Sequence, residues 1–200
     1  MLARRMSSEH IMLLLASASP RRRELLSTLG LPFEVLTTDV DESLVSGEAP
    51  ERSVARLAER KAEAGSRLHP KALVLGADTL VVLEGFAFGK PRDAAQARSM
   101  LRQLSGKKHQ VWTGVAVASA GRPTSSRAVV AEVGFRALSA GEIETYVATG
   151  EPLDKAGAYA IQGRAAAFVT ELRGELSAVV GLPMSATLEL LRERGMVSGA

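Results

Sequence analysis

Residues 11–30 read IMLLLASASPRRRELLSTLG, a stretch in which an apolar run passes directly into a helical pattern. The run Ile11–Ala16 is typical of a buried strand, because a signal peptide needs an apolar centre of about 7–15 residues and three arginines follow this one. A serine N-cap, a proline at the first helical position and a glycine just past the end predict a helix over Pro20–Leu29. A buried strand that leads at once into a helix indicates an α/β domain.

The rest of the chain continues to alternate between strands and helices. Further strands are predicted at Phe33–Thr38, Ala72–Leu83, Phe86–Phe88, Gln110–Ser119 and Ala128–Ala137. Further helices are predicted at Glu51–Gly65, at Ala94–Leu104, between Ser139 and Gly150, and from Pro183 to Gly195. A hairpin is predicted from Ala165–Leu172 and Leu176–Val180 around Gly174. The two long alternating strands after residue 109 predict a mixed sheet. We expect one domain over residues 11–197, preceded by a flexible extension over residues 1–10.

Composition excludes several classes of protein. The 200 residues are 46% hydrophobic and 24% charged, which is ordinary for a globular protein. There are no cysteines, so disulfides and thiolate metal sites are excluded, and a cytoplasmic location is expected. A net charge of +3 is too small to indicate stable nucleic-acid binding. No run approaches the roughly 20 apolar residues of a membrane span.

The first candidate site is Ser17-Ala18-Ser19-Pro20-Arg21-Arg22-Arg23, where the first strand ends and the first helix begins. Backbone N–H groups at a helix start bind anions, and arginine donates two parallel hydrogen bonds to a phosphate. Arginines in a first turn interact unfavourably with the helix dipole, by about 0.3–1 kcal/mol each. A bound phosphate would make the interaction at this end of the helix favourable. Ser17, Ser19, Arg21 and Arg22 are therefore candidate substrate ligands, although a solvent-facing basic turn would have the same sequence.

Lys61 falls inside the apolar stripe of the helix predicted over Glu51–Gly65. With Val54 at 0° and a step of about 100° per residue, Leu57 lies at about 300° and Lys61 at about 340°. A lysine at this position either extends its ammonium group to the surface or is kept charged by a buried phosphate.

Asp78 stands in the middle of LVLGADTLVVL, residues 73–83. A carboxylate in such a run is costly unless a metal, a cation or a hydrogen bond compensates it. Buried acids beside cations are frequently functional, which favours a catalytic role. A bulge at Gly76 would instead expose the carboxylate.

Common motifs of nucleotide-binding and hydrolytic enzymes are absent. Gly89-Lys90-Pro91 has proline where a P-loop needs a hydroxyl, and there is no GxGxxG, G-x-S-x-G or HExxH. The three histidines, His10, His69 and His109, are expected on the surface. The small residues of Asp154–Gly163 would let a ligand approach the backbone, although a plain glycine-containing loop looks the same.

Taken together, these segments resemble the Maf family of nucleotide pyrophosphatases. The likeness runs from about Met12 to Gly195 and includes, in order, LLLASASPRRRELL, GADTLVV, FGKPRD, LSGKKHQVWTGV, EPLDKAGAYAIQG and VVGLP. It implies an elongated α/β fold with a central cleft, related to the inosine triphosphate pyrophosphatase architecture, and usually a homodimer. It also implies hydrolysis of dTTP and UTP to the monophosphate and pyrophosphate with a divalent cation, Mg²⁺ or Mn²⁺. Clearing of modified pyrimidine nucleotides is a further expectation.

The resemblance also implies a role for individual residues. The phosphate ligands that it implies are Arg21, Arg22, Lys61 and Lys90. Asp78 looks like the group that accepts a proton from water, and Glu42 looks like a carboxylate on the metal beside it. The positions that separate the UTP/dTTP branch from the 7-methyl-GTP branch are Arg21, Thr79 and Gln162, and all three match the former.

Some positions depart from the family pattern, and two alternatives to its activity stay open. Ala160 and Ala166 stand where glycine is more frequent, and Leu176 stands where an aromatic residue is usual. One alternative is a cell-division or septum regulator that binds a partner without catalysis. The other is a pyrophosphatase for another nucleotide, such as CTP or 7-methyl-GTP.

Overall fold

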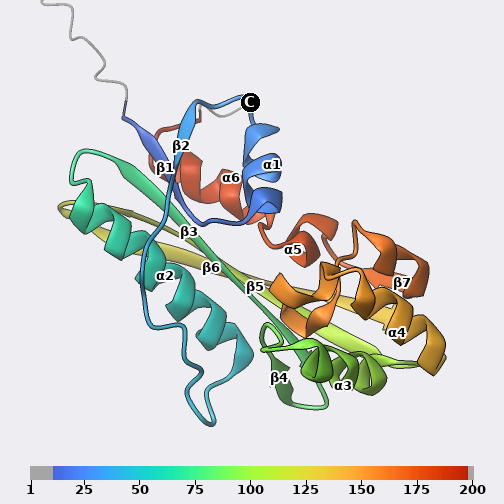
Figure 1. Cartoon of the computed structure of the whole chain (residues 1–200). Coiled ribbons are helices and arrows are strands. Elements are labelled where there is room, and N and C mark those ends of the chain that lie inside the picture. Colours follow the sequence, from blue (N-terminus) through green and yellow to red (C-terminus); the bar gives the residue numbers. More distant parts are fainter. Residues whose placement is uncertain (1–10, 198–200) are drawn as a thin grey trace, which may run out of the picture.

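The computed structural model describes residues 11–197, so the extension predicted at residues 1–10 lies outside the described residues. The molecule is an elongated α/β structure in which a seven-stranded sheet runs from end to end (Figure 1). The strands are β1 (Leu13–Ala16), β2 (Phe33–Leu36), β3 (Leu73–Leu83), β4 (Phe86–Phe88), β5 (Lys108–Ser119), β6 (Arg122–Phe135) and β7 (Val169–Arg173).

Helices cover the sheet. They are α1 (Pro20–Ser27), α2 (Pro50–Leu68), α3 (Ala94–Leu104), α4 (Ala140–Ala148), α5 (Leu176–Val180) and α6 (Met184–Glu193), together with the 3₁₀ turns η1 (Glu151–Asp154), η2 (Ala156–Ala158) and η3 (Arg164–Phe168). Within residues 11–197, no helix is both long and apolar enough to cross a bilayer.

The sheet is mixed, as the long hairpin strands predict. Its order is β2-β1-β3-β5-β6-β7, and β4 pairs with β3. The β1–β2 and β1–β3 pairs are parallel, whereas every pair from β3 onward is antiparallel. Strands β3 and β5 stay in one register from Val74 opposite Ala118 to Val82 opposite Gln110. The suggested bulge at Gly76 is therefore wrong.

Glycines on the sheet let the backbone of α2 lie directly against it. A Cβ atom at Gly76 would stand 2.3 Å from the carbonyl oxygen of Ala58, and one at Gly114 would stand 2.2 Å from that of Val54. Such distances are far inside van der Waals contact, so no larger residue fits at either position. This close approach brings the buried face of α2, which includes Lys61, onto the middle of β3.

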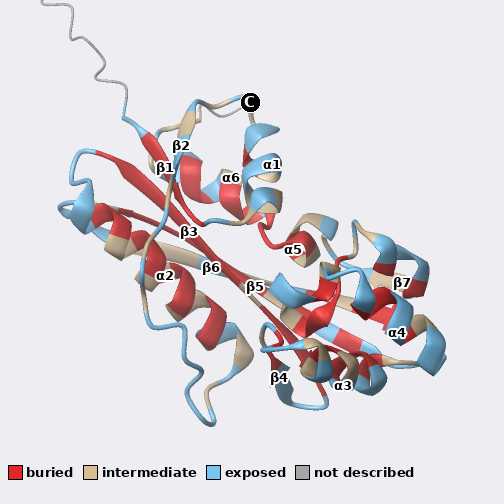
Figure 2. Cartoon of the chain, in the orientation of Figure 1, coloured by how far each residue is buried: buried red, intermediate tan, exposed pale blue. Residues whose placement is uncertain are grey.

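Two hydrophobic cores lie at opposite ends of the sheet, and β3 and β5 run through both (Figure 2). One core packs α1 and α6 against β1, β3 and β5. The other gathers side chains of α3, α4 and the segment from η2 to η3. Ala77 belongs to the first core and Val81 to the second, so Asp78 and Thr79 stand where the strand passes from one to the other.

The predicted hairpin around Gly174 is wrong, because its second arm is a helix, although part of its first arm is a strand. Residues 164–168 form the turn η3, so the strand β7 begins only at Val169, and Leu176–Val180 forms the helix α5. The helix ends at Gly181, whose φ of 118° is left-handed and whose N–H donates to the carbonyl of Ser177. A mainly apolar segment of five residues fits a buried strand and a helical turn equally well, because it is too short to show a period.

His109 is buried, which contradicts its predicted place on the surface. It is 2% exposed on β5, and its Nε2 lies 2.9 Å from the hydroxyl of Tyr159. Its Nδ1 has no hydrogen-bond partner among the described residues. Phe135 and Tyr159 meet the imidazole edge-on, with ring centroids 5.0 Å and 5.4 Å away. Burial lowers the pKa of His109 from 6.5 to about 4.

Stability is expected to fall as the pH drops from 7.5 to 5. The unfolded chain binds a proton on this histidine below about pH 6.5, whereas folded His109 stays neutral until about pH 4, so acid favours unfolding across that window. The loss in the free energy of unfolding should be about 2 kcal/mol at pH 5. Urea unfolding at the two pH values measures it. The loss should persist in His69→Asn, an exposed histidine, and vanish in His109→Asn; equal wild-type stability at both pH values would contradict it.

Candidate functional site

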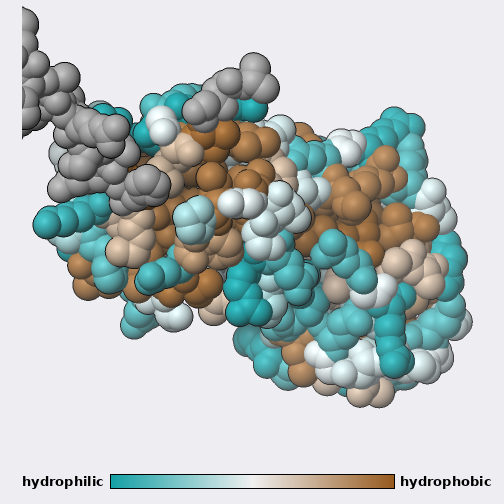
Figure 3. Space-filling model, turned by 90° about the horizontal axis from the view of Figure 1, so that it is seen from above, coloured by the Kyte–Doolittle hydropathy of each residue, from teal (hydrophilic) through white to brown (hydrophobic). Residues whose placement is uncertain are grey.

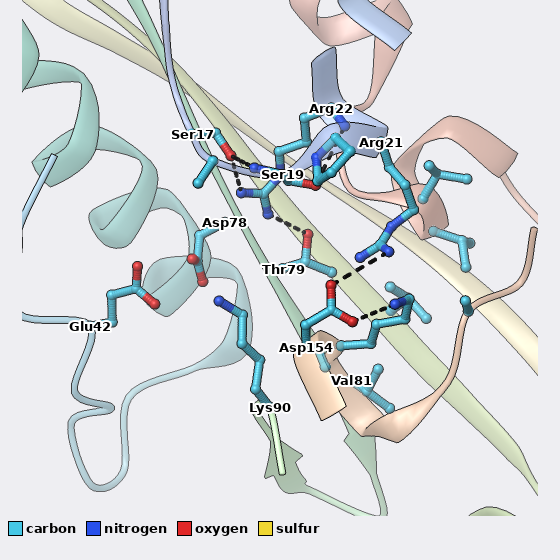
Figure 4. A pocket seen from close by; sticks show the side chains of 18 of the residues that line it. Ser17, Ser19, Arg21, Arg22, Glu42, Asp78, Thr79, Val81, Lys90 and Asp154 are labelled. Carbon is cyan, nitrogen blue, oxygen red and sulfur yellow. Dashed lines mark hydrogen bonds and ion pairs between the residues drawn. The ribbon is translucent and has the colours of Figure 1, made fainter. Parts of the chain in front are cut away.

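A cavity of about 490 Å³ lies where the two cores meet. Its walls come from the β1–α1 turn, α2, β3 and the segment between η1 and η3 (Figure 4). All of the predicted site residues line it: Ser17, Ser19, Arg21, Arg22, Glu42, Lys61, Asp78, Thr79, Lys90 and Gln162. Residues that are up to 145 positions apart in the sequence are thus brought to one place, since the cavity includes both Ser17 and Gln162.

Lys61 points into the cavity and joins two carboxylates. Its Nζ lies 2.6 Å from Oδ1 of Asp78 and 2.8 Å from Oε1 of Glu42. The side chains of Lys61 and Asp78 are 9% and 11% exposed, so the ammonium does not extend to the surface, and that alternative is wrong. Partial burial raises the pKa of Glu42, but the hydrogen bond and charge of Lys61 outweigh it and hold that pKa below its ordinary value.

Three carboxylates line the cavity, and two of them, Asp78 and Glu42, lie close enough together to share one partner. Both carboxylates converge on one positive charge, the Lys61 ammonium, although β3 carries one and the loop before α2 carries the other. The described residues hold no cluster of three or more His, Cys, Asp or Glu suited to a metal. Two carboxylates suit Mg²⁺, which is commonly bound by one or two of them together with substrate phosphates and water.

Arg22 is built into the wall of the cavity. Its Nε donates to the carbonyl of Gly181 at 2.7 Å, and its Nη1 donates to the carbonyl of Ala77 at 2.9 Å and to Oγ of Ser17 at 3.2 Å. Its Nη2 donates to Oγ1 of Thr79 at 3.2 Å. These bonds use four of the five guanidinium N–H groups. Arg22 therefore ties α1 to β3 and α5, and a single N–H remains for a phosphate.

Thr79 continues this network as a chain of hydroxyl groups with a fixed direction. Its Oγ1 lies 3.0 Å from that of Thr113, which donates its only hydrogen to the carbonyl of Ala178 at 2.8 Å. Thr79 must therefore donate to Thr113 while it accepts from Arg22. It has a lone pair but no hydrogen left for a ligand. Sequence analysis missed Thr113, which is fully buried. A threonine between apolar residues of a predicted strand is a signal that could have found it.

Arg21, by contrast, is only weakly held. Its Nη1 lies 3.9 Å from Oδ2 of Asp154 (Figure 4). The other carboxylate oxygen of Asp154 pairs with Lys155. The side chain of Asp154 is 66% exposed, and exposed ion pairs contribute little, about 0–1 kcal/mol. The contact spans the cavity from α1 to η1. A phosphate can therefore replace Asp154 as the partner of Arg21 at small cost.

Two further residues lie at the open side of the cavity. Lys90 follows β4, is exposed, and reaches toward Asp78 and Glu42 (Figure 4). Gln162 is exposed in the turn between η2 and η3. Lys61 and Lys90 thus lie beside the two carboxylates, while the glutamine amide comes from the segment of the chain on the side of the second core.

Comparison with known proteins gives a consistent result. The Maf-like protein family matches residues 12–194. The chain is 51% identical over 191 residues to the dTTP/UTP pyrophosphatase of Myxococcus xanthus, covering 96% of each protein. It is 56% identical over 180 residues to the dTTP/UTP pyrophosphatase of Yersinia pestis, covering 90% of this chain and 91% of the relative. Among solved structures, the Staphylococcus aureus Ham1 protein has the same fold at a TM-score of 0.51 and 12% identity, covering 92% of this chain and 97% of that one.

Proposed function

This chain belongs to the Maf family, and on that premise we propose that it is a nucleoside triphosphate pyrophosphatase that hydrolyses dTTP and UTP to the monophosphate and pyrophosphate. The observation that carries the proposal is the meeting of the four predicted basic side chains and the two predicted carboxylates in one cavity, which Lys155 and Asp154 line as a further pair. The basic residues are Arg21, Arg22, Lys61 and Lys90, and the acids are Glu42 and Asp78. A triphosphate brings about four negative charges, and the four basic groups, less the two carboxylates, would offset them together with a divalent cation.

The two ends of the cavity suit the two ends of a nucleotide. The basic residues hold and orient the phosphate chain, and they offset the charge that develops as the α–β phosphoanhydride bond breaks. At the other end, the amide of Gln162 offers one acceptor and one donor group. Uracil and thymine present an N3–H beside a carbonyl, which this pair of groups matches.

Asp78 is the group that activates water. A carboxylate that is 8% exposed and paired with Lys61 stays in one orientation, as a general base must. Asp78 and Glu42 would hold a divalent cation between them, with substrate oxygens completing the ligand set. When bound, that cation supplies Lewis-acid polarisation of the phosphate. No covalent nucleophile is needed, because water attacks directly.

Assembly and location form a second part of the proposal. We expect the protein to work in the cytosol as a homodimer, as the resemblance to its family implies. Figure 3 shows apolar residues gathered over much of the face seen from above, the side on which α1, α5 and α6 lie. On α5, Leu176 is 47% exposed. Broad exposed apolar surface is typical of interfaces, and light scattering after gel filtration measures the oligomeric state.

A panel of triphosphates assayed with the purified protein tests the proposed function. UTP and dTTP should exceed GTP in kcat/KM by about 10-fold or more, the discrimination that one well-placed pair of hydrogen bonds gives between bases. CTP belongs in the panel as a separate comparison, because the Gln162 amide can turn to match cytosine. Pyrophosphate and orthophosphate should be measured separately, so that contaminating phosphatases are recognised. Absence of pyrophosphate release from every nucleotide in the presence of Mg²⁺ or Mn²⁺ would contradict the proposal and favour a protein that acts by binding a partner.

A further inference from the structure

Two residues outside the cavity wall hold the turn that carries Gln162. Tyr146 lies on α4 and is 3% exposed, and Glu151 begins η1. The hydroxyl of Tyr146 donates to Oε1 of Glu151 at 2.8 Å and accepts from the backbone N–H of Ala160 at 3.1 Å. The carboxylate of Glu151 in turn accepts from the backbone N–H of Arg164, at 3.1 Å from Oε1 and 3.3 Å from Oε2.

These contacts fix the backbone on both sides of Gln162. Ala160 is two residues before it and Arg164 two residues after it, and the N–H of Gly163 closes the turn on the carbonyl of Ala160 at 3.0 Å. The direction of the hydrogen bonds is fixed as well. Burial raises the pKa of Tyr146, the bond from Ala160 opposes this and the bond to Glu151 adds to it. Tyr146 thus keeps its proton for Glu151.

The glycine after Gln162 leaves room for the same carboxylate. A Cβ atom at Gly163 would stand 2.2 Å from Oε1 of Glu151 and 2.6 Å from its Cδ. The backbone itself is unstrained for any residue, since φ of Gly163 is −105°. The absence of a side chain at Gly163 therefore serves packing, because the carboxylate of Glu151 occupies the place of a Cβ atom and contacts the turn directly.

We propose that Tyr146 and Glu151 are positioning residues for base recognition, which set the place of the Gln162 amide at the base end of the cavity. This inference rests on the proposed function, in which Gln162 meets the uracil or thymine edge. The pair belongs to α4 and η1, whereas the phosphate ligands and Asp78 belong to α1, α2, β3 and the segment after β4. Loss of the pair should therefore impair discrimination between bases more than catalysis.

The test compares Tyr146→Phe and Glu151→Ala with the wild type on UTP and GTP. Phenylalanine leaves the Ala160 N–H without its acceptor, and alanine removes the carboxylate that accepts from Tyr146 and from the Arg164 N–H. Each variant should lower the ratio of kcat/KM for UTP over GTP by about 10-fold, mainly through a higher KM for UTP, with kcat for UTP within about 3-fold of the wild type. Gly163→Ala disturbs the same contact through the turn itself, because its Cβ would displace the Glu151 carboxylate. It should also lower the UTP-to-GTP ratio.

Glu142→Gln is the matched control, because it weakens the capping box of α4 with Ser139 and leaves the turn untouched. It should lower stability without changing the UTP-to-GTP ratio. An unchanged ratio in the Tyr146, Glu151 and Gly163 variants, or equal losses on both nucleotides, would overturn the inference while the wild type still hydrolyses UTP. A wild type without activity on UTP would overturn the proposed function first. If one variant does not fold, as judged by thermal melting, the other two decide.

Discussion

Asp78→Asn is expected to lower kcat for UTP hydrolysis by about 100-fold or more, the scale at which general-base catalysis contributes. An amide has almost the same shape as the carboxylate but cannot take a proton from water. Lys61 keeps a partner in this variant, because Glu42 lies 2.8 Å from its Nζ. The fold and the binding of nucleotide should therefore persist, and the loss should be in kcat with KM changed little. Steady-state kinetics with circular dichroism on the same sample measure both.

Glu48→Gln provides the control for this experiment. Glu48 also pairs with a basic residue of α2, since Oε2 lies 2.7 Å from Nη2 of Arg56, but it is outside the cavity. Its replacement should cost stability and leave kcat unchanged. If Asp78→Asn kept near wild-type turnover, the Lys61–Asp78 pair would be a purely structural ion pair, and another group would have to activate the water.

Gln162→Glu is expected to reduce the ratio of kcat/KM for UTP over GTP by about 10- to 100-fold, since a good pair of hydrogen bonds discriminates between bases by about 1–3 kcal/mol. A glutamate carboxylate only accepts hydrogen bonds, so it would face the uracil carbonyl with a negative oxygen. Guanine instead offers two adjacent donors, its N1–H and its exocyclic amine, which suit a carboxylate. The ratio should therefore fall for two reasons, because the variant binds uracil less well and guanine better.

Gln103→Glu introduces the same negative charge on an exposed position of α3, away from the cavity, and should leave the ratio unchanged. Equal ratios in the wild type and Gln162→Glu would mean that Gln162 does not contact the base. An amide can turn to match cytosine as well, so Gln162 alone does not reject CTP. Thr79 has only a lone pair left for a ligand, which makes it a candidate to meet a donor group of the base.

The elements that sequence analysis predicted well are those with a long period or clear caps. The helix α3 spans the predicted Ala94–Leu104, and the box of Ser139 and Glu142 begins α4 as expected. Helical phase alone placed Lys61 on the buried face of α2, where it lies. The strand predicted at Leu176–Val180 was wrong because five residues are too few to show a period. The helix found there ends at Gly181, whose backbone is left-handed and whose neighbours in space include Arg22 and Thr79.

The site was predictable as a set of residues but not as a network. Sequence patterns and the family resemblance identified many of the charged and polar residues that line the cavity, because charge in an apolar context is visible without a structure. The engagement of Arg22 with Gly181, 159 positions away, depends on how the two cores meet, and no local pattern reports it. The support of Gln162 by Tyr146 and Glu151 was missed for the same reason. His109 was misplaced because a lone histidine in a strand gives no sign of which face is buried.

The products formed from UTP, identified by anion-exchange chromatography, test the central claim most directly. Wild-type protein and Asp78→Asn should be incubated side by side with UTP and a divalent cation. The account predicts UMP and pyrophosphate in equal amounts from the wild type, and almost none from the variant in the same time. UDP and orthophosphate from the wild type, or equal amounts of product from both proteins, would contradict it.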